Sequence, residues 1–442
     1  MKRLVLGLLA ALAIGLPACA ASDSEDADSS DDALVASFHR QGITDLSKTT
    51  RILLVGDSDE LADLPLHAAT TRAQRYQQLY PHDQIILFVT KDASADLVSA
   101  TGSTVLQREG LGQAAISDLS TLTAEKLIAA LRRFTRIASL DFFGHSSPFG
   151  ALLENGTPDH TLGPDTPTNI AALADNFARD TNPYATLNGC NGGTYTAAAL
   201  SRAWHIPVSG ALTASNFEIL LSDGRWYPNE KTDYPDGLTP TTVNDKSFGP
   251  GLTPACSTGA CVRMKPQNSP YWGIWSPDTG FQYGLNYYKF FCDYDDPTNT
   301  CAKGMATSLF AYPSIKPIDK TSSAADINDV IADFFCDGAK DATWFDTCKA
   351  GLLSAVSTGA AFSPMKGSND YSLECDFKGC EQKFRCTMQN GVPQYHTCQW
   401  VSKACTDAQP ATSCRPKVAT KQTTTREVKR YLEGIQLLRG GR

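Results

Sequence analysis

Two chemically reactive side chains, a histidine and a cysteine, each follow directly on a short apolar segment. His145 lies in GHSS (144–147), after the apolar run 138–143, and Cys190 lies in NGCNGG (188–193), after the run 184–187. A thiol with an ordinary pKa of about 8.5 is mostly protonated at neutral pH, and a neighbouring imidazole or helix N-terminus favours the reactive thiolate. A helix is predicted to start near residue 194, directly behind Cys190. The pair is therefore a candidate for nucleophilic catalysis by cysteine.

Alternating strands and helices must position this pair. The pattern predicts strands at 51–56, 84–90, 138–143, 184–187 and 206–212, and helices at 62–80, 121–137, 168–179 and 194–204. Short apolar strands that alternate with helices predict an α/β fold, in which a mostly parallel sheet carries helices on both faces. Because neighbouring parallel strands end at the same edge of a sheet, we expect His145 and Cys190 to lie within side-chain reach.

The remaining cysteines follow a different pattern. Apart from Cys19 and Cys190, they form an even set of twelve after residue 250, namely Cys256, Cys261, Cys292, Cys301, Cys336, Cys348, Cys375, Cys380, Cys386, Cys398, Cys405 and Cys414. In an exported chain such a set indicates disulfides, although the spacing does not give their pairing. Zinc is the rival for Cys375 and Cys380, but the sequence contains no C-x-x-C pair, so we expect no metal site. Cys190 is left as an unpaired thiol at a glycine-rich strand end.

The order of the two motifs resembles the caspase-fold cysteine peptidases, the group of caspases, legumain, clostripain, gingipains and separase. The resemblance covers about residues 50–222, and the 45 residues from His145 to Cys190 are similar to the separation of about 50 in caspases. It implies an endopeptidase in which Cys190 attacks the scissile carbonyl and His145 protonates the leaving amine. The N–H groups of Ser146 and Cys190 would hold the oxyanion, with Gly189 shaping the turn.

The sequence departs from that family at two positions. Ser146 stands where many members have a glycine after the histidine, and Asn188-Gly189-Cys190 replaces the caspase Q-A-C, which argues against specificity for aspartate. Asp57 and Asp59, just beyond the first strand, could bind a basic P1 side chain, although Asp at a strand end is ordinarily a turn former.

Other functions fit the same residues. A Cys–His acyltransferase or thioesterase would use the same pair on esters. In a non-catalytic surface lipoprotein, the α/β domain would be a scaffold and the disulfide-rich modules would bind a partner.

The N-terminus has the three parts of an export signal. Lys2 and Arg3 precede an apolar run at 4–16 that is too short for a stable membrane span, and small residues follow. We interpret 1–20 as a signal peptide in which LPAC (16–19) resembles a lipobox with Cys19 as the lipidated residue; an A-x-A cut at 18–20 is the alternative. The first reading predicts a lipoprotein of the bacterial outer membrane or cell surface, and the second a periplasmic or secreted protein. Residues 21–48 begin with an acidic, serine-rich run and are expected to form a flexible tether.

Composition divides the rest of the chain into four segments. They are the peptidase-like α/β domain 49–250, an aromatic-rich, disulfide-containing extension 251–365, a small Cys-rich module 366–415 and a basic tail 416–442. From residue 415 to 442 there are eight Lys or Arg and two Glu, which gives a net charge of +6. We expect a solvated helix at 425–438, or one that contacts anionic lipid.

The net charge of the whole chain, −8, argues against a nucleic-acid partner. We predict a protein or peptide substrate, a lipid-anchored membrane attachment and no cofactor.

Overall fold

The longest apolar runs of the sequence become the strands of one sheet. In the computed structural model, β2 (Thr50–Val55) and β5 (Ile137–Phe143) are buried along their whole length. Strands of this kind are typical of parallel sheets, because the connecting helices cover both faces. The structure describes residues 37–40, 45–56, 61, 64–90, 115–119, 123–147, 150–154, 158–164, 166–193, 196–211, 215–220, 226–228, 261–266, 288–298, 300–312, 318, 321–336, 342–358, 374–375, 384–389, 392–400, 416–417 and 421–440.

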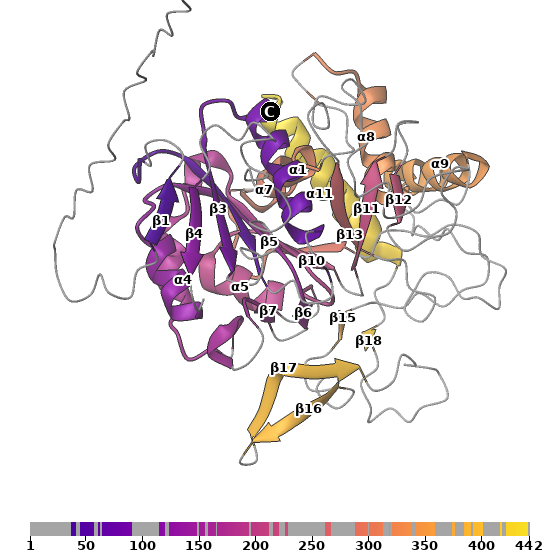
Figure 1. Ribbon diagram of the computed structural model, residues 1–442. Coiled ribbons are helices and arrows are strands. Elements are labelled where there is room, and N and C mark those ends of the chain that lie inside the picture. Colours follow the sequence, from indigo (N-terminus) through magenta and orange to yellow (C-terminus); the bar gives the residue numbers. More distant parts are fainter. Residues whose placement is uncertain are drawn as a thin grey trace, which may run out of the picture. The chain divides into compact units, whose positions relative to one another are not determined.

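This sheet is mixed and mostly parallel. Its order is β1 (Ser37–Arg40), β4 (Ala115–Leu119), β3 (Gln84–Thr90), β2, β5, β9 (Tyr184–Asn188), β10 (Val208–Ala211) and β14 (Tyr288–Phe291) (Figure 1). The six central strands run parallel, and the edge strands β1 and β14 are antiparallel to their neighbours. The predicted α/β class with a mostly parallel sheet is confirmed.

Alternate residues of the strands face opposite layers of helices. Leu53 and Phe143 pack in one apolar cluster with residues of α1 (Leu64–Leu79). Leu54 and Phe142 pack in another, with residues of α4 (Ala124–Leu131) and α5 (Thr196–Trp204). The sheet therefore carries helices on both faces, which is why its strands read as continuous apolar runs.

Two predicted helices are shorter than expected. Helix α4 begins after Thr123, whose hydroxyl accepts the N–H of Lys126 at 3.2 Å, and it ends at Leu131. The segment predicted at 168–179 holds two short 3-10 turns, η3 (Ile170–Asn176) and η4 (Arg179–Thr181). Leu173 is the only buried side chain of η3, so this segment has too little apolar surface to support a longer helix.

Chain segments outside 49–250 also belong to the folded unit, which spans Val35–Arg442. Strand β1 lies within the predicted tether, yet it pairs with β4 through Ser37–Arg40, so the tether prediction is wrong for these four residues. Strand β14, from the predicted extension, completes the other edge of the main sheet. The composition boundary near residue 250 is therefore not a boundary of the sheet.

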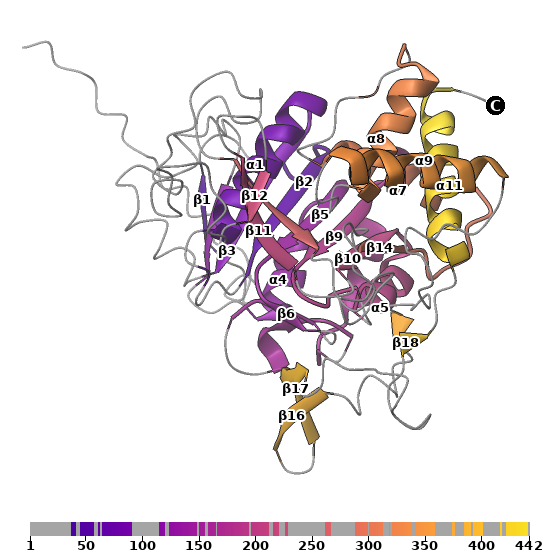
Figure 2. The ribbon, with the colours of Figure 1, turned by 90° about the vertical axis from the view of Figure 1, so that its right-hand side faces the viewer.

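A third apolar cluster consists mainly of four helices. They are α7 (Thr300–Phe310), α8 (Ala324–Cys336), α9 (Ala342–Thr358) and α11 (Lys421–Leu438), and α11 lies beside α7 (Figure 2). Val428, Tyr431 and Ile435 of α11 are fully buried in this cluster. The predicted terminal helix is present, but it is not solvated on all sides: its apolar stripe packs into this cluster, while Lys429, Arg430 and Glu433 are exposed.

Smaller elements complete the described structure. One three-stranded sheet consists of β6 (Ser146–Ser147), β7 (Gly150–Leu152) and β8 (Thr161–Leu162), and the turn η2 (Pro158–His160) precedes β8. A second three-stranded sheet has the order β12 (Trp226–Pro228), β11 (Ser215–Leu220) and β13 (Val262–Pro266). Two strand pairs remain, β15 (Glu374–Cys375) with β18 (Pro416–Lys417) and β16 (Phe384–Gln389) with β17 (Val392–Trp400). Disulfides join Cys292 to Cys301 and Cys336 to Cys348, and Cys261 is also disulfide-bonded. Of the helices that the structure describes, none has the length and apolar character needed to cross a bilayer.

Candidate active site

Strand register gives His145 and Cys190 matching positions in the sheet. Strands β5 and β9 are parallel neighbours, and their last paired residues are Phe143 and Asn188. His145 lies two residues beyond Phe143, and Cys190 lies two residues beyond Asn188. Residues 144–147 (the His145 loop) and residues 189–193 (the Cys190 turn) therefore leave the carboxyl edge of the sheet side by side, as the sequence predicted.

This edge also contains the switch point of the sheet. From β2 the chain continues to β3 on one side and later returns to β5 on the other, so the connections after β2 and β5 diverge. Ligands of open α/β sheets bind in the crevice that such a divergence leaves. The N–H of Gly56, at the end of β2, donates to the carbonyl oxygen of Phe143 at 2.8 Å, which joins β2 to the start of the His145 loop.

Glycines let the two loops touch. A Cβ atom added to Gly189 would lie 2.2 Å from Ser146 Oγ and 2.8 Å from the carbonyl oxygen of Gly144. The backbone just before Cys190 is therefore in contact with the residues on either side of His145. Gly144 has φ of 148°, a conformation that L side chains rarely adopt, so the entry to the His145 loop also needs a glycine.

The turn after Cys190 is equally crowded. Asn191 is left-handed with φ of 59°, and the N–H of Gly193 donates to the carbonyl oxygen of Ala211 on β10 at 2.9 Å. A Cβ at Gly193 would lie 2.3 Å from the carbonyl oxygen of Gly210. The sequence NGCNGG thus reverses the chain in the narrow space between the His145 loop and β10.

Cys190 carries a thiol that is free and half-buried. It is the free cysteine among the residues whose side chains the structure describes. Its Sγ accepts the N–H of Ser215 at 3.4 Å and lies 3.8 Å from the Ser215 hydroxyl. Ser215 begins β11, so the strand that follows β10 in the chain reaches back to the sulfur. An N–H group directed at the sulfur would stabilise a negative charge there.

Ser146 joins the two loops through its side chain. Its hydroxyl donates to the carbonyl oxygen of Cys190 at 2.7 Å. Ser146 also begins β6, which pairs with β7, and the N–H of Leu152 donates to the carbonyl oxygen of His145 at 2.9 Å. The backbone of the His145 loop is therefore held by a small sheet on one side and by the Cys190 turn on the other.

Three predicted site residues and three other histidines remain to be placed. Asp57, Asp59 and Cys19 lie outside the described residues. Among the remaining histidines, His67 is buried in α1, and His160 lies 3.4 Å from the Glu154 carboxylate. His205 is left-handed, with φ of 53°, and stacks on Tyr294 at the amino ends of β9 and β10.

A buried polar network lies under the cysteine-bearing strand. Asp141 of β5 is fully buried and accepts hydrogen bonds from Arg72 Nη1 at 3.2 Å and from the hydroxyls of Tyr76 and Thr186. Asn188 Nδ2 in turn donates to Thr186 Oγ1 at 3.1 Å. The network therefore extends from α1 through β5 to the residue at the base of the Cys190 turn.

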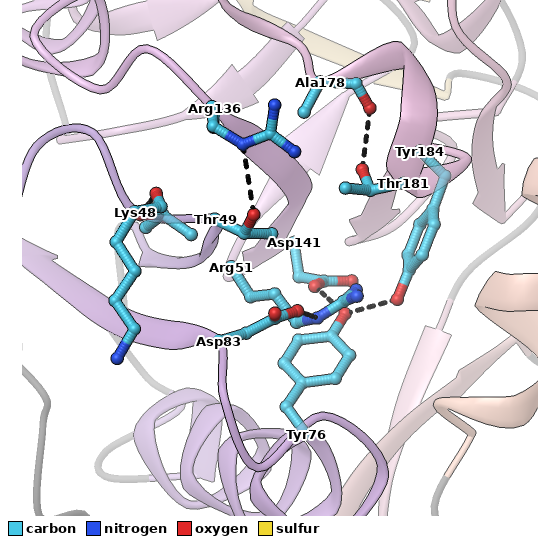
Figure 3. Close-up of polar contacts among 11 residues, drawn as sticks. Lys48, Thr49, Arg51, Tyr76, Asp83, Arg136, Asp141, Ala178, Thr181 and Tyr184 are labelled. Carbon is cyan, nitrogen blue, oxygen red and sulfur yellow. Dashed lines mark hydrogen bonds and ion pairs between the residues drawn. The ribbon is translucent and has the colours of Figure 1, made fainter.

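Two tyrosines supply neutral donors to this network. The Tyr76 and Tyr184 hydroxyls lie 2.7 Å apart, next to Asp141 (Figure 3). Burial raises the pKa of Tyr76 above its ordinary value, and the negative charge of Asp141 raises it further. Arg51 lies beside them, with Nε 2.8 Å from the Asp83 carboxylate and its guanidinium 3.4 Å from the centre of the Tyr80 ring. Each buried arginine is therefore paired with a carboxylate, Arg51 with Asp83 and Arg72 with Asp141.

Sequence reasoning missed Asp141 and Ser215. Asp141 lies within the apolar run IASLDFF. A single carboxylate inside a buried strand needs a partner, so its position in this run was the signal that could have predicted a buried polar network. Ser215 carries no comparable signal, because its contact with Cys190 depends on how β11 returns to the carboxyl edge.

Comparison with protein-family models, with curated proteins and with solved structures finds no match for this chain. Fold and site define an α/β protein with a free cysteine and a histidine on adjoining loops at the carboxyl edge of its sheet.

Proposed function

We propose that this protein is a cysteine endopeptidase with Cys190 as nucleophile and His145 as its acid–base partner. The observation that carries the proposal is the matched position of these residues, each two places beyond a paired residue of neighbouring parallel strands. The switch point next to them is where substrates of open α/β sheets bind. The mostly parallel sheet and the order histidine then cysteine are also what the resemblance to caspase-fold peptidases implies.

The proposed reaction has two steps. The Cys190 thiol gives its proton to His145, and its sulfur bonds to the scissile carbonyl carbon. The C–N bond then breaks as His145 gives that proton to the leaving amine. Water then attacks the thioester, His145 accepts its proton, and the peptide acid leaves as the thiol forms again. The N–H groups of Ser146 and Cys190 are assigned to the oxyanion. Gly189, where a Cβ would lie 2.2 Å from Ser146 Oγ, shapes the turn between them.

Purified protein and a peptide library varied at P1 test this proposal. We expect the wild type to cleave peptides, and we expect Cys190→Ala and His145→Ala each to lose at least about 100-fold in kcat/KM. His160→Gln is the matched control, because this histidine belongs to the neighbouring β7–η2–β8 segment, and it should retain activity. Equal cleavage by wild type and Cys190→Ala would exclude Cys190 as the nucleophile. Cleavage of esters alone would indicate an acyltransferase or thioesterase, and a wild type inert to both would indicate a non-catalytic surface protein.

The same library tests the P1 preference. We propose that Asp57 and Asp59 bind a basic P1 side chain, because in the sequence both come soon after β2, a strand of the switch point. Asp57→Asn and Asp59→Asn should then raise KM for Lys and Arg peptides while leaving KM for uncharged P1 residues unchanged. Equal effects on both groups of peptides would remove the two carboxylates from the proposal.

Export and anchoring are proposed with the enzyme. Residues 1–20 are proposed as the signal peptide and Cys19 as the lipid-bearing residue, which would place the peptidase on the bacterial outer membrane or cell surface. Fractionation should find the wild type with membranes and Cys19→Ala in the soluble fraction. Soluble wild type with a cut between residues 20 and 21 would indicate ordinary secretion or a periplasmic protein.

A further inference from the structure

We infer that the side chain of Ser146 is a positioning residue that holds the Cys190 backbone; this inference rests on the proposed nucleophile. The oxyanion assignment concerns the backbone N–H of Ser146, whereas the inference concerns its hydroxyl. That hydroxyl donates to the carbonyl oxygen of Cys190 at 2.7 Å. Because the carbonyl belongs to the nucleophile itself, this bond fixes the peptide plane between Cys190 and Asn191.

Cys190 is thereby held at two points, its carbonyl oxygen and its sulfur. Ser146, on the His145 loop, holds the carbonyl, and the N–H of Ser215, on β11, donates to the sulfur at 3.4 Å. With the carbonyl and the sulfur both constrained, the Cα–Cβ bond of Cys190 has little freedom to turn. The hydrogen bond from Ser146 therefore helps to fix the direction in which the thiol points. Nucleophilic attack requires such a fixed direction.

Close packing turns the Ser146 side chain toward the turn. A Cβ at Gly189 would lie 2.7 Å from Ser146 Cβ, and a Cβ at Gly192 would lie 3.5 Å from Ser146 Oγ. The serine side chain therefore occupies the space beside two glycines of NGCNGG. A glycine at 146 would remove both the hydroxyl and the packing atom, so the departure from the family pattern has a structural role here.

Asn191 shows why the turn needs such a tie. Its φ of 59° is left-handed, a conformation that non-glycine residues adopt only at a cost in backbone strain. The Ser146 bond lies on the adjacent peptide and helps to offset that strain. Without it, we expect the turn between β9 and α5 to sample other conformations, which would move the thiol away from Ser215.

Alkylation of Cys190 by iodoacetamide measures the position of the thiol without any assumption about a substrate. We compare the pH profile of the alkylation rate in wild type, Ser146→Ala and Ser147→Ala. Ser147 is the control because it is the next residue of the same strand. We expect Ser146→Ala to move the profile to higher pH and to slow alkylation at pH 7 by roughly 3- to 10-fold, while Ser147→Ala keeps the wild-type profile.

Two outcomes would overturn the inference. One is a Ser146→Ala profile that coincides with the wild type, and the other is an equal displacement in Ser147→Ala, which would indicate a general disturbance of the hairpin. If Ser146→Ala does not fold, Ser146→Thr replaces it in the test, because threonine keeps the hydroxyl and suits a strand. A folded Ser146→Thr variant with the wild-type profile supports the inference. A displaced profile contradicts it.

Cleavage assays give a second reading where the proposed peptidase is active. Ser146→Ala should lower kcat with little change in KM, because the role assigned to the hydroxyl is to hold Cys190 and not to bind substrate. A wild type that cleaves no peptide would defeat the proposed function while leaving the alkylation result to decide on Ser146.

Discussion

At the scale of single residues, two buried carboxylates of the described structure are each paired with a cation. Asp141 accepts from Arg72, Tyr76 and Thr186, and Glu218 of β11 pairs with Arg263 at 2.6 Å and Lys265 at 3.3 Å. An unpaired buried charge is far more costly than a paired one, so each member of such a group depends on the others. These pairs join the sheet to α1 and β11 to β13.

Asp141→Asn tests this dependence. The substitution leaves Arg72 buried without its counter-charge, and we expect the free energy of unfolding to fall by about 3–5 kcal/mol. Asp180→Asn is the control, because Asp180 pairs with Arg136 at the surface, with 67% and 39% of their side chains exposed. We expect Asp180→Asn to lower the free energy of unfolding by less than about 1 kcal/mol. Urea titration measures both variants. Similar costs for the two variants would contradict the account of a buried pair.

The sequence indicated His145 and Cys190 as candidate residues, but it did not indicate Ser215 or the buried network around Asp141. Both residues are recognisable because they combine a reactive type with a position at a strand end. Asp141 was visible only as an exception within an apolar strand, and its partners come from α1 and β9. Side-chain pairing between distant elements depends on packing angles, which local patterns do not contain.

At the scale of elements, the prediction succeeded where a segment has a clear apolar pattern. The predicted strand 84–90 coincides with β3, because a buried parallel strand needs an uninterrupted apolar run. Strand β4, in contrast, carries the mixed sequence AISDL and was not predicted. The predicted helix at 168–179 became 3-10 turns, because a helical pattern alone does not supply an apolar face to bury.

Gly193→Ala tests how tightly the Cys190 turn is fitted between elements. The new Cβ would lie 2.3 Å from the carbonyl oxygen of Gly210, a backbone atom of β10, so the turn or the strand must move. We expect a loss of roughly 1–3 kcal/mol in the free energy of unfolding, together with slower alkylation of Cys190.

Gly192→Ala is the matched control for that change. Its Cβ would meet a side-chain atom, Leu187 Cβ, at 3.1 Å rather than a backbone oxygen. We therefore expect a smaller loss of stability at position 192. A larger loss there, or no loss at 193, would show that the space between the turn and β10 is not limiting.

At the scale of the whole molecule, composition is a poor guide to where a folded unit ends. The basic C-terminal segment has a net charge of +6, yet α11 contributes Val428, Tyr431 and Ile435 to an apolar cluster with α7, α8 and α9. Charge count describes the exposed face of a helix, whereas packing depends on its apolar stripe. The pairing of that stripe with helices that lie far from it in the sequence could not be read from local sequence.

Tyr431→Ala tests the place of α11 in the fold. Tyr431 is fully buried against Phe290, Phe334 and Phe335, with ring centres 5.7–5.8 Å apart. Removing this ring should lower the free energy of unfolding by about 3–5 kcal/mol, as for other large core aromatics. Lys429→Ala, on the exposed face of the same helix, should change it by less than about 0.5 kcal/mol. Equal and small effects would indicate that α11 is a detachable surface helix.

Covalent capture by a peptidyl electrophile tests the central claim most directly. A peptide chloromethyl ketone is incubated with the wild type and with His145→Ala, and the labelled residue is found by mass spectrometry of a digest. We predict one adduct on Cys190, formed much more slowly in His145→Ala, and loss of peptide cleavage in step with labelling. Labelling of another residue, or cleavage that continues after Cys190 is fully labelled, would contradict the assignment of Cys190 as the nucleophile.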